Sequence, residues 1–225
     1  MRHRTTIAAA ARRGARAKLR HGAALLAALL SGTAALAAPD SAELIARLAR
    51  TAPASIAFVE VRFSPLLVEP LVVRGTLDYE GAAALNRRVE APYRETTSIS
   101  GETVRVERDG ESPRTFGLRR APELRGLLTG MVGLLGGDST LLREHFGITT
   151  TGDDAAWRLD LAPSDDRMQQ RLRTITVTGA EDEPHCFVIR DTQGGASVML
   201  LGGAAARPLQ PPVALDELLD SCSAE

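Results

Sequence analysis

The chain has 225 residues, 44% of them hydrophobic, and carries 27 Lys and Arg against 28 Asp and Glu. This length predicts one or two domains, and this composition excludes global disorder and a bundle of membrane-spanning helices. Seven basic residues precede the first acidic one, Asp40, so a chain without residues 1–37 has 20 basic and 28 acidic residues and a net charge of −8. A body this acidic, without a basic stripe, argues against nucleic acid as a partner. Lys18 is the only lysine, which excludes Schiff-base and P-loop chemistry from the rest of the chain.

The first 37 residues have the pattern of a secretory signal peptide. A basic segment ends at His21, an apolar run covers residues 22–30, and small residues lead to Ala37. The alternative is a membrane anchor, but that needs about 20 apolar residues and this run is much shorter. We therefore expect cleavage near Ala37 and export to the periplasm, with residues 38–225 as a single domain.

A helix and then a series of strands are expected next along the chain. Asp40 and Glu43 form a capping box, and Thr51–Pro53 ends the helix that follows it. Beyond it, apolar and polar residues alternate in short segments separated by turn signals every 8–12 residues, which predicts one antiparallel sheet, strongly curled or partly closed. The expected strands cover residues 57–63, 72–79, 86–92, 94–99, 104–106, 114–118, 146–151, 157–161, 175–177, 187–190 and 197–201.

The segment 121–146 interrupts this alternation with a helical pattern. Five large apolar side chains recur at helical spacing and form one stripe. They are Leu124, Leu127, Leu128, Met131 and Leu135. Gly126, Gly130 and Gly133 lie on another side, and each disfavours the helix by roughly 1 kcal/mol relative to Ala. A second short helix over 140–145, capped by Asp138 or Ser139, follows. We interpret the pair as a lid over an apolar groove, and the alternative is an ordinary core helix.

The expected fold class is all-β with a helical lid: a curved antiparallel sheet that forms an unclosed half-barrel covered by short helices. An apolar inner face under a lid of Leu, Met and Gly has the composition of a site for a flexible apolar ligand such as an acyl chain. The alternative is a hollow filled by the protein's own side chains. Besides the five lid residues, the expected cavity residues are Val59, Val61, Phe63, Val73, Leu77, Tyr79 and Trp157.

The two cysteines, Cys186 and Cys222, both lie in the part expected to be exported. In an oxidising compartment such a pair indicates a disulfide, with two buried free thiols as the alternative. Residues 208–212 read as a stiff linker to a C-terminal helix, and Cys222 lies on the apolar face of that helix. The bridge would fasten this helix to the strand that follows Cys186.

Several segments resemble the periplasmic outer-membrane lipoprotein carrier family. The run from Ser64 to Tyr79, SPLLVEPLVVRGTLDY, is similar to the family's second-strand region with its G-x-L-x-y strand. Residues 89–93 and 99–104 resemble the family's P-x-x…i-x-G-x-x-v segment in order and spacing. The resemblance extends over about residues 41–203. It implies an unclosed β-barrel with a helical lid that carries acyl chains through the periplasm.

The sequence also departs from that family. The carriers have a basic-Pro element after the G-x-L-x-y strand, and its arginine helps to hold the lid. Here the corresponding residues are Glu80, Gly81 and Ala82. The cysteine pair and the C-terminal helix are further additions. We therefore expect a divergent relative, of the branch that accompanies lipid or polyene-ester export systems.

No motif predicts an enzyme. The sequence has no G-x-S-x-G, H-E-x-x-H, C-x-x-C or Gly-rich phosphate loop. His145 is expected to end a helix, where a cation offsets the helix dipole. The acidic segment 181–186 is expected to be a solvated turn rather than a zinc site. We expect no cofactor, no metal and no catalytic residue.

The predicted function is a periplasmic carrier that binds the acyl chains of a lipoprotein, glycolipid or similar cargo and moves it between the inner and outer membranes. Its expected partners are that cargo, an inner-membrane exporter and an outer-membrane acceptor, and it is expected to act as a monomer. The alternative is an adaptor of the same fold that senses lipid or envelope stress and regulates a membrane partner.

Overall fold

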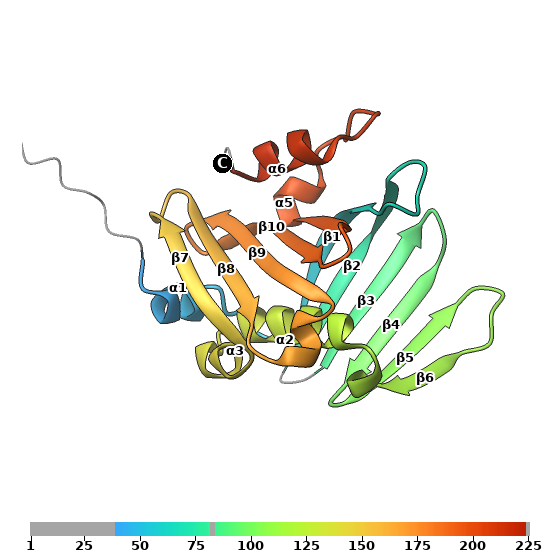
Figure 1. The fold of residues 1–225 in the computed structure, drawn as a ribbon, viewed down its shortest axis with the longest axis horizontal. Helices are drawn as coiled ribbons and strands as arrows, with labels where there is room; N and C mark the ends of the chain where they lie inside the picture. The colour runs from blue at the N-terminus through green and yellow to red at the C-terminus, as the bar shows by residue number, and fades with distance from the viewer. Residues whose placement is uncertain (1–38, 82–83, 224–225) are drawn as a thin grey trace, which may run out of the picture. The chain divides into compact units, whose positions relative to one another are not determined.

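A single antiparallel sheet organises the part of the chain that the computed structural model describes, residues 39–81 and 84–223 (Figure 1). The predicted signal peptide lies outside these residues. The strand order is β6-β5-β4-β3-β2-β1-β11-β10-β9-β8-β7, and the end strands β6 and β7 do not pair, so the sheet is not closed. The predicted fold class is therefore confirmed. The strands are β1 (Ala54–Phe63), β2 (Leu71–Gly81), β3 (Ala84–Ala91), β4 (Glu95–Ser100), β5 (Thr103–Arg108), β6 (Arg114–Gly117), β7 (Phe146–Gly152), β8 (Trp157–Pro163), β9 (Leu172–Ala180), β10 (Glu183–Asp191) and β11 (Ala196–Leu201).

Short helices cover both faces of this sheet. The predicted capping by Asp40 is present, since its side chain accepts hydrogen bonds from the backbone N–H groups of Ala42 and Glu43. Asp138 likewise caps the second helix of the lid segment by accepting from the N–H of Leu141. Among the described residues, none of the helices is long and apolar enough to cross a membrane. The helices are α1 (Ser41–Arg47), the 3-10 helix η1 (Leu118–Arg120), α2 (Pro122–Leu135), α3 (Ser139–His145), α4 (Asp166–Gln169), α5 (Gly202–Ala205) and α6 (Leu215–Ser223).

The contacts of α2 show how strongly the sheet curves. This helix touches β9 on one side and β2 and β3 on the other, although three strands separate β9 from β2 in the sheet. Only a sheet bent around the helix brings both sides to it, and Figure 1 shows α2 between the two halves of the sheet. We call the sheet face that packs on α1, α2 and α3 the lid face, and the opposite face, which packs on α5 and α6, the back face.

The central strands are largely buried on both faces, although the alternation of apolar and polar residues indicated one buried face. In β1, four consecutive residues from Phe58 to Val61 are buried, and β11 and β10 show similar runs. The reason is the back-face cover: α5 contacts β1, β10 and β11, and α6 contacts β11 and β9. A strand covered on both faces loses the polar–apolar alternation from which its inner face would be read.

Candidate functional site

The helix α2 lies closer to the sheet than its sequence pattern indicated. A Cβ added at Gly130 would lie 3.4 Å from the side chains of Ile175 and Phe187, and one at Gly126 would lie 2.7 Å from Leu172. Both glycines are buried, so the glycine side of the helix, which is separate from the leucine stripe as predicted, also packs on the sheet. At these two positions the helix backbone comes close to the lid face. A larger residue at either position would prevent this close approach.

The end of α2 is also fastened to its neighbours. The backbone N–H of Arg50, just after α1, donates to the carbonyl oxygen of Leu135 at 2.7 Å. A Cβ at Gly137 would lie 2.8 Å from that of Ala49, and this glycine has φ of +66°, so the turn between α2 and α3 favours glycine. The layer beneath α2 is therefore packed with the protein's own side chains, and a long ligand requires α2 to move.

Most of the predicted cavity residues meet in one cluster on the lid face. Val73, Leu77, Tyr79, Leu128, Met131, Leu135 and Trp157 are buried there, and Leu124 and Leu127 are partly buried against it. We call this cluster the lid-face core. Its remaining members come chiefly from α1, from β7 to β9 and from the ends of β3 to β5.

Three predicted cavity residues lie elsewhere. Val59 and Val61 are buried on the back face, and Phe63 packs against the same back-face cluster. Their placement with the lid is therefore wrong. Because strand side chains alternate between faces, Phe58 and Glu60 take the lid-face positions of β1 instead. The sequence did contain a signal for this second buried face. Phe58 is a large aromatic residue at a position of β1 where the alternation predicts polar residues.

A cavity of about 230 Å³ opens beside α2, between the helix pair and the turn from β4 to β5. Leu128 and Val132 of α2, Leu141 of α3, and Ile99 and Leu118 supply its apolar wall. Leu128, Ile99 and Leu118 also belong to the lid-face core, so the cavity is continuous with it. The volume is smaller than the roughly 300–1,000 Å³ of typical ligand pockets, so the cavity can admit only part of an acyl chain while α2 stays in place.

Charged residues adjoin the apolar part of the lid face. Glu60 is 5% exposed, and its carboxylate accepts hydrogen bonds from Arg62 Nε at 2.7 Å, from Ser197 Oγ at 2.6 Å and from Arg87. The guanidinium of Arg87 lies 4.9 Å from the ring centre of Phe58, a member of the lid-face core. We call Glu60, Arg62, Arg87 and Ser197 the polar cluster. Burial alone would raise the pKa of Glu60, but the hydrogen bonds from Arg62 and the charge of Arg87 outweigh burial and lower this pKa to about 2.

The lowered pKa predicts a specific loss of stability in acid. Because the pKa of Glu60 falls from 4.5 to about 2 on folding, its stabilising contribution is complete above pH 4.5 and disappears as the pH falls to about 2. The difference corresponds to at most about 3 kcal/mol. Urea unfolding of the wild type and of Glu60→Gln at pH 7 and pH 2 measures it, since the other carboxylates are common to both proteins. Wild type should lose more stability than the variant, and parallel pH profiles would contradict the assignment.

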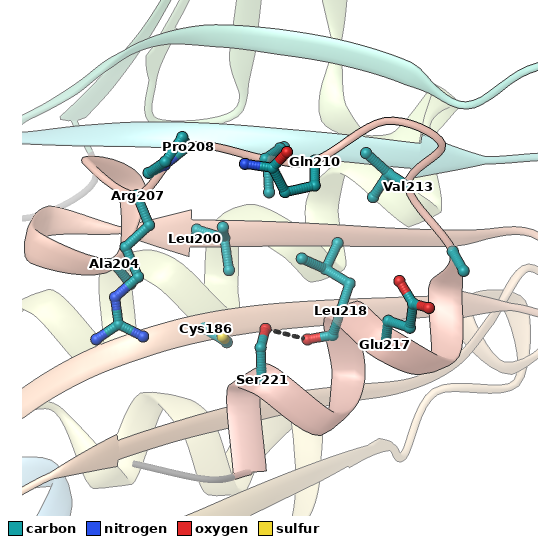
Figure 2. A pocket seen from close by; sticks show the side chains of 12 residues that line it. Cys186, Leu200, Ala204, Arg207, Pro208, Gln210, Val213, Glu217, Leu218 and Ser221 are labelled. Carbon is teal, nitrogen blue, oxygen red and sulfur yellow. Dashed lines mark hydrogen bonds between the residues drawn. The ribbon is translucent and has the colours of Figure 1, made fainter.

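A second cavity, of about 280 Å³, lies on the back face under α6 (Figure 2). Leu218 of α6 points toward Leu200 of β11 in this view, and Arg207 and Glu217 also line the cavity. Cys222 of α6 forms a disulfide with Cys186 of β10, so the structure has the bridge rather than the free thiols. The bridge restrains the opening that a long ligand would need. We therefore interpret this cavity as a packing gap between α6 and the sheet and not as the ligand site.

An apolar loop protrudes between β1 and β2. Leu66, Leu67 and Val68 are 93%, 43% and 103% exposed, and they are the large hydrophobic side chains that stand out as exposed within residues 39–81 and 84–223. Ser64 shapes the loop, because its carbonyl oxygen accepts from the N–H of Leu67 and its hydroxyl oxygen accepts from the N–H of Leu66. Three adjacent exposed apolar residues at a loop tip indicate a contact surface.

The two segments that were weighed as catalytic or metal-binding candidates lie in different elements. His145 ends α3 and lines the rim of the cavity beside α2. Residues 181–186, expected as a turn, begin in the turn after β9 and continue into β10, and Cys186 is taken up by the disulfide. Within the described part of the chain, no group of three or more His, Cys, Asp or Glu side chains could hold a metal ion.

Comparison with known proteins gives one family. The sequence model described as "Outer membrane lipoprotein carrier protein LolA-like" matches residues 33–220. No curated protein matches the chain.

The solved structures that match the chain share little sequence with it. A LolA superfamily protein from Nitrosomonas europaea has 11% identity and a TM-score of 0.43, over 77% of this chain and 96% of that one. An outer membrane lipoprotein-sorting protein domain from Vibrio parahaemolyticus has 10% identity and a TM-score of 0.40, over 80% and 94%. The MucA/MucB complex of Pseudomonas aeruginosa gives 14% identity and a TM-score of 0.39, over 80% and 60%.

Proposed function

Because the chain belongs to the outer membrane lipoprotein carrier, LolA-like family, we propose that it is a periplasmic carrier that binds the acyl chains of a lipoprotein, glycolipid or similar lipid beneath α2. It takes this cargo from an inner-membrane exporter and delivers it to an outer-membrane acceptor. The observation that carries the proposal is the apolar cavity beside α2, whose wall continues into the lid-face core.

Binding requires α2 and α3 to move away from the lid face. The helix has a poor intrinsic propensity, because three of its fourteen residues between Pro122 and Leu135 are Gly126, Gly130 and Gly133. Its stability comes from the burial of Leu128, Met131 and their neighbours on the sheet. An acyl chain that enters between the lid face and these side chains restores the apolar contacts that the sheet gives up, and Leu128 and Met131 then cover the chain. The exchange conserves buried apolar area, so its free-energy difference is small.

A carrier must also reach a membrane, and the loop from Ser64 to Pro70 is suited to this step. Its exposed side chains Leu66, Leu67 and Val68 are the kind that enter the interface of a bilayer. The alternative function, a lipid-sensing adaptor, needs binding but no delivery. Retention and delivery of cargo therefore have to be measured separately.

Vesicle-to-vesicle transfer of a fluorescent acyl lipid tests the carrier function. Wild type is expected to accelerate transfer between donor and acceptor vesicles, and the variant with Leu66, Leu67 and Val68 all changed to Ser is expected to retain the lipid in solution but transfer it several-fold more slowly. Ser100, at the exposed end of β4, is changed to Ala as a surface control. Retention without any transfer by the wild type would favour the adaptor function, and absence of both would contradict a lipid-binding role.

A further inference from the structure

The lid face changes from apolar to charged along β1. On this strand Phe58, Glu60 and Arg62 occupy successive lid-face positions. Phe58 is buried in the lid-face core, Glu60 is buried but ionised, and the side chain of Arg62 is 39% exposed. Along β1, the lid face is therefore apolar where it is covered and charged near the end of the strand.

The polar cluster joins strands that are not neighbours. Arg87 extends from β3 across β2 to reach Glu60 on β1, and Ser197 reaches it from β11. A buried ion pair is a weak source of stability, because the loss of hydration offsets most of the attraction. Well-packed apolar side chains of similar size would stabilise the sheet as well as this ion pair does. We therefore look for a role of the charged side chains other than stabilisation.

The polar cluster carries an excess positive charge. Two guanidinium groups, of Arg62 and Arg87, share the single carboxylate of Glu60, and Ser197 is neutral. Arg108 does not add to this excess, because it is paired with the carboxylate of Glu95 at 2.6 Å. Guanidinium groups bind carboxylates and phosphates through hydrogen bonds. Arg62 already donates to Glu60 from Nε at 2.7 Å and from Nη2 at 3.1 Å, so a head group would bind the remaining N–H donors of this partly exposed side chain.

We propose that the polar cluster binds an anionic head group, a carboxylate or a phosphate, of an acyl ligand whose chain lies in the lid-face core. This inference rests on the proposed carrier function and specifies its cargo as an anionic amphiphile. Arg62 contacts the head group, Glu60 holds Arg62 and Arg87 in place while the site is empty, and the contact between Arg87 and Phe58 marks the boundary between head and chain.

The test compares decanoic acid with methyl decanoate, which has the same chain length but no charge, by calorimetric titration at neutral pH. The wild type is expected to bind the acid roughly tenfold to a hundredfold more tightly, which is the worth of hydrogen bonds to a charged group. In Arg62→Gln this preference should fall to nearly one while binding of the ester stays unchanged. Arg74→Gln removes the same charge from an exposed position of β2 and should keep the preference.

The outcomes separate the two levels of the proposal. Equal binding of acid and ester by the wild type, or an unchanged preference in Arg62→Gln, overturns the head-group assignment and leaves the carrier function standing. Binding of neither ligand overturns both. A large excess of acetate, which has the carboxylate without the chain, is expected to leave decanoate binding unchanged, and displacement by acetate would indicate a site for free anions instead.

Discussion

Replacement of Leu128 by Asp is expected to abolish retention of a fluorescent acyl probe. Leu128 is 4% exposed, belongs to the lid-face core and lines the cavity beside α2. A carboxylate at this buried position would lose its hydration, at a free-energy cost of about 1–3 kcal/mol in addition to the lost apolar contact. Arg125 and His145, which line the same cavity, could pair with it only toward the rim, away from the lid-face core. Moving α2 away from the sheet avoids that cost, so the variant should keep its strands but leave the lid face open. Probe affinity should fall by more than about tenfold.

The matched control is Leu66→Asp, which makes the same substitution at a side chain that is 93% exposed. It should leave both the affinity for the probe and the far-ultraviolet circular dichroism unchanged. A similar dichroism spectrum in the two variants would show that Leu128→Asp has not simply unfolded the sheet. Unchanged retention by a folded Leu128→Asp protein would show that α2 covers no ligand site.

Removal of the disulfide is expected to cause the largest loss of stability. The bridge closes a loop with a sequence separation of 36 residues, so the Cys186→Ala/Cys222→Ala variant should lose about 4 kcal/mol of unfolding free energy by the loop-entropy estimate. Its α6 should detach and expose the back-face cluster around Val198 and Leu218 to a hydrophobic dye. Urea unfolding and dye fluorescence measure these two effects.

Acyl binding supplies the control for the same variant. The back-face cluster and the lid-face core lie on opposite faces of the sheet, so probe retention should survive wherever the variant is still folded. Reduction of the wild type should reproduce the loss of stability, and reductant should not affect the variant. An unfolding free energy equal to that of the wild type would contradict the role of the bridge, and loss of retention by the folded variant would contradict the separation of the two faces.

The sequence predicted the strands and helices well where each segment carried its own pattern. Alternation located the strands, and the spacing of Leu124, Leu128 and Met131 located α2, because both patterns are local. The short helices α4 and α5 were missed. Asp165 caps α4 by accepting from the N–H groups of Arg167 and Met168. A helix of four residues is too short for its apolar residues to show the helical spacing from which a helix is predicted.

The site was harder to predict because it depends on pairing. Val59 looked like an inner-face residue, since the sequence does not show that α5 covers the other face of β1. Glu60 and Arg87 are 27 positions apart, and only the strand order β3-β2-β1 brings them together. Gly75 is part of that pairing, because a Cβ there would lie 1.7 Å from the carbonyl oxygen of Arg88.

The most direct test of an acyl site beneath α2 uses Trp157, the only tryptophan in the chain. Its ring is 1% exposed in the lid-face core, and its Nε1–H donates to the carbonyl oxygen of Glu181 at 3.1 Å. A fatty acid with a nitroxide label on its chain quenches this emission only when the label comes close to the ring. The carrier account predicts saturable quenching with one fatty acid per protein in the wild type and none in Leu128→Asp. Wild-type emission that stays constant at saturating fatty acid would contradict it.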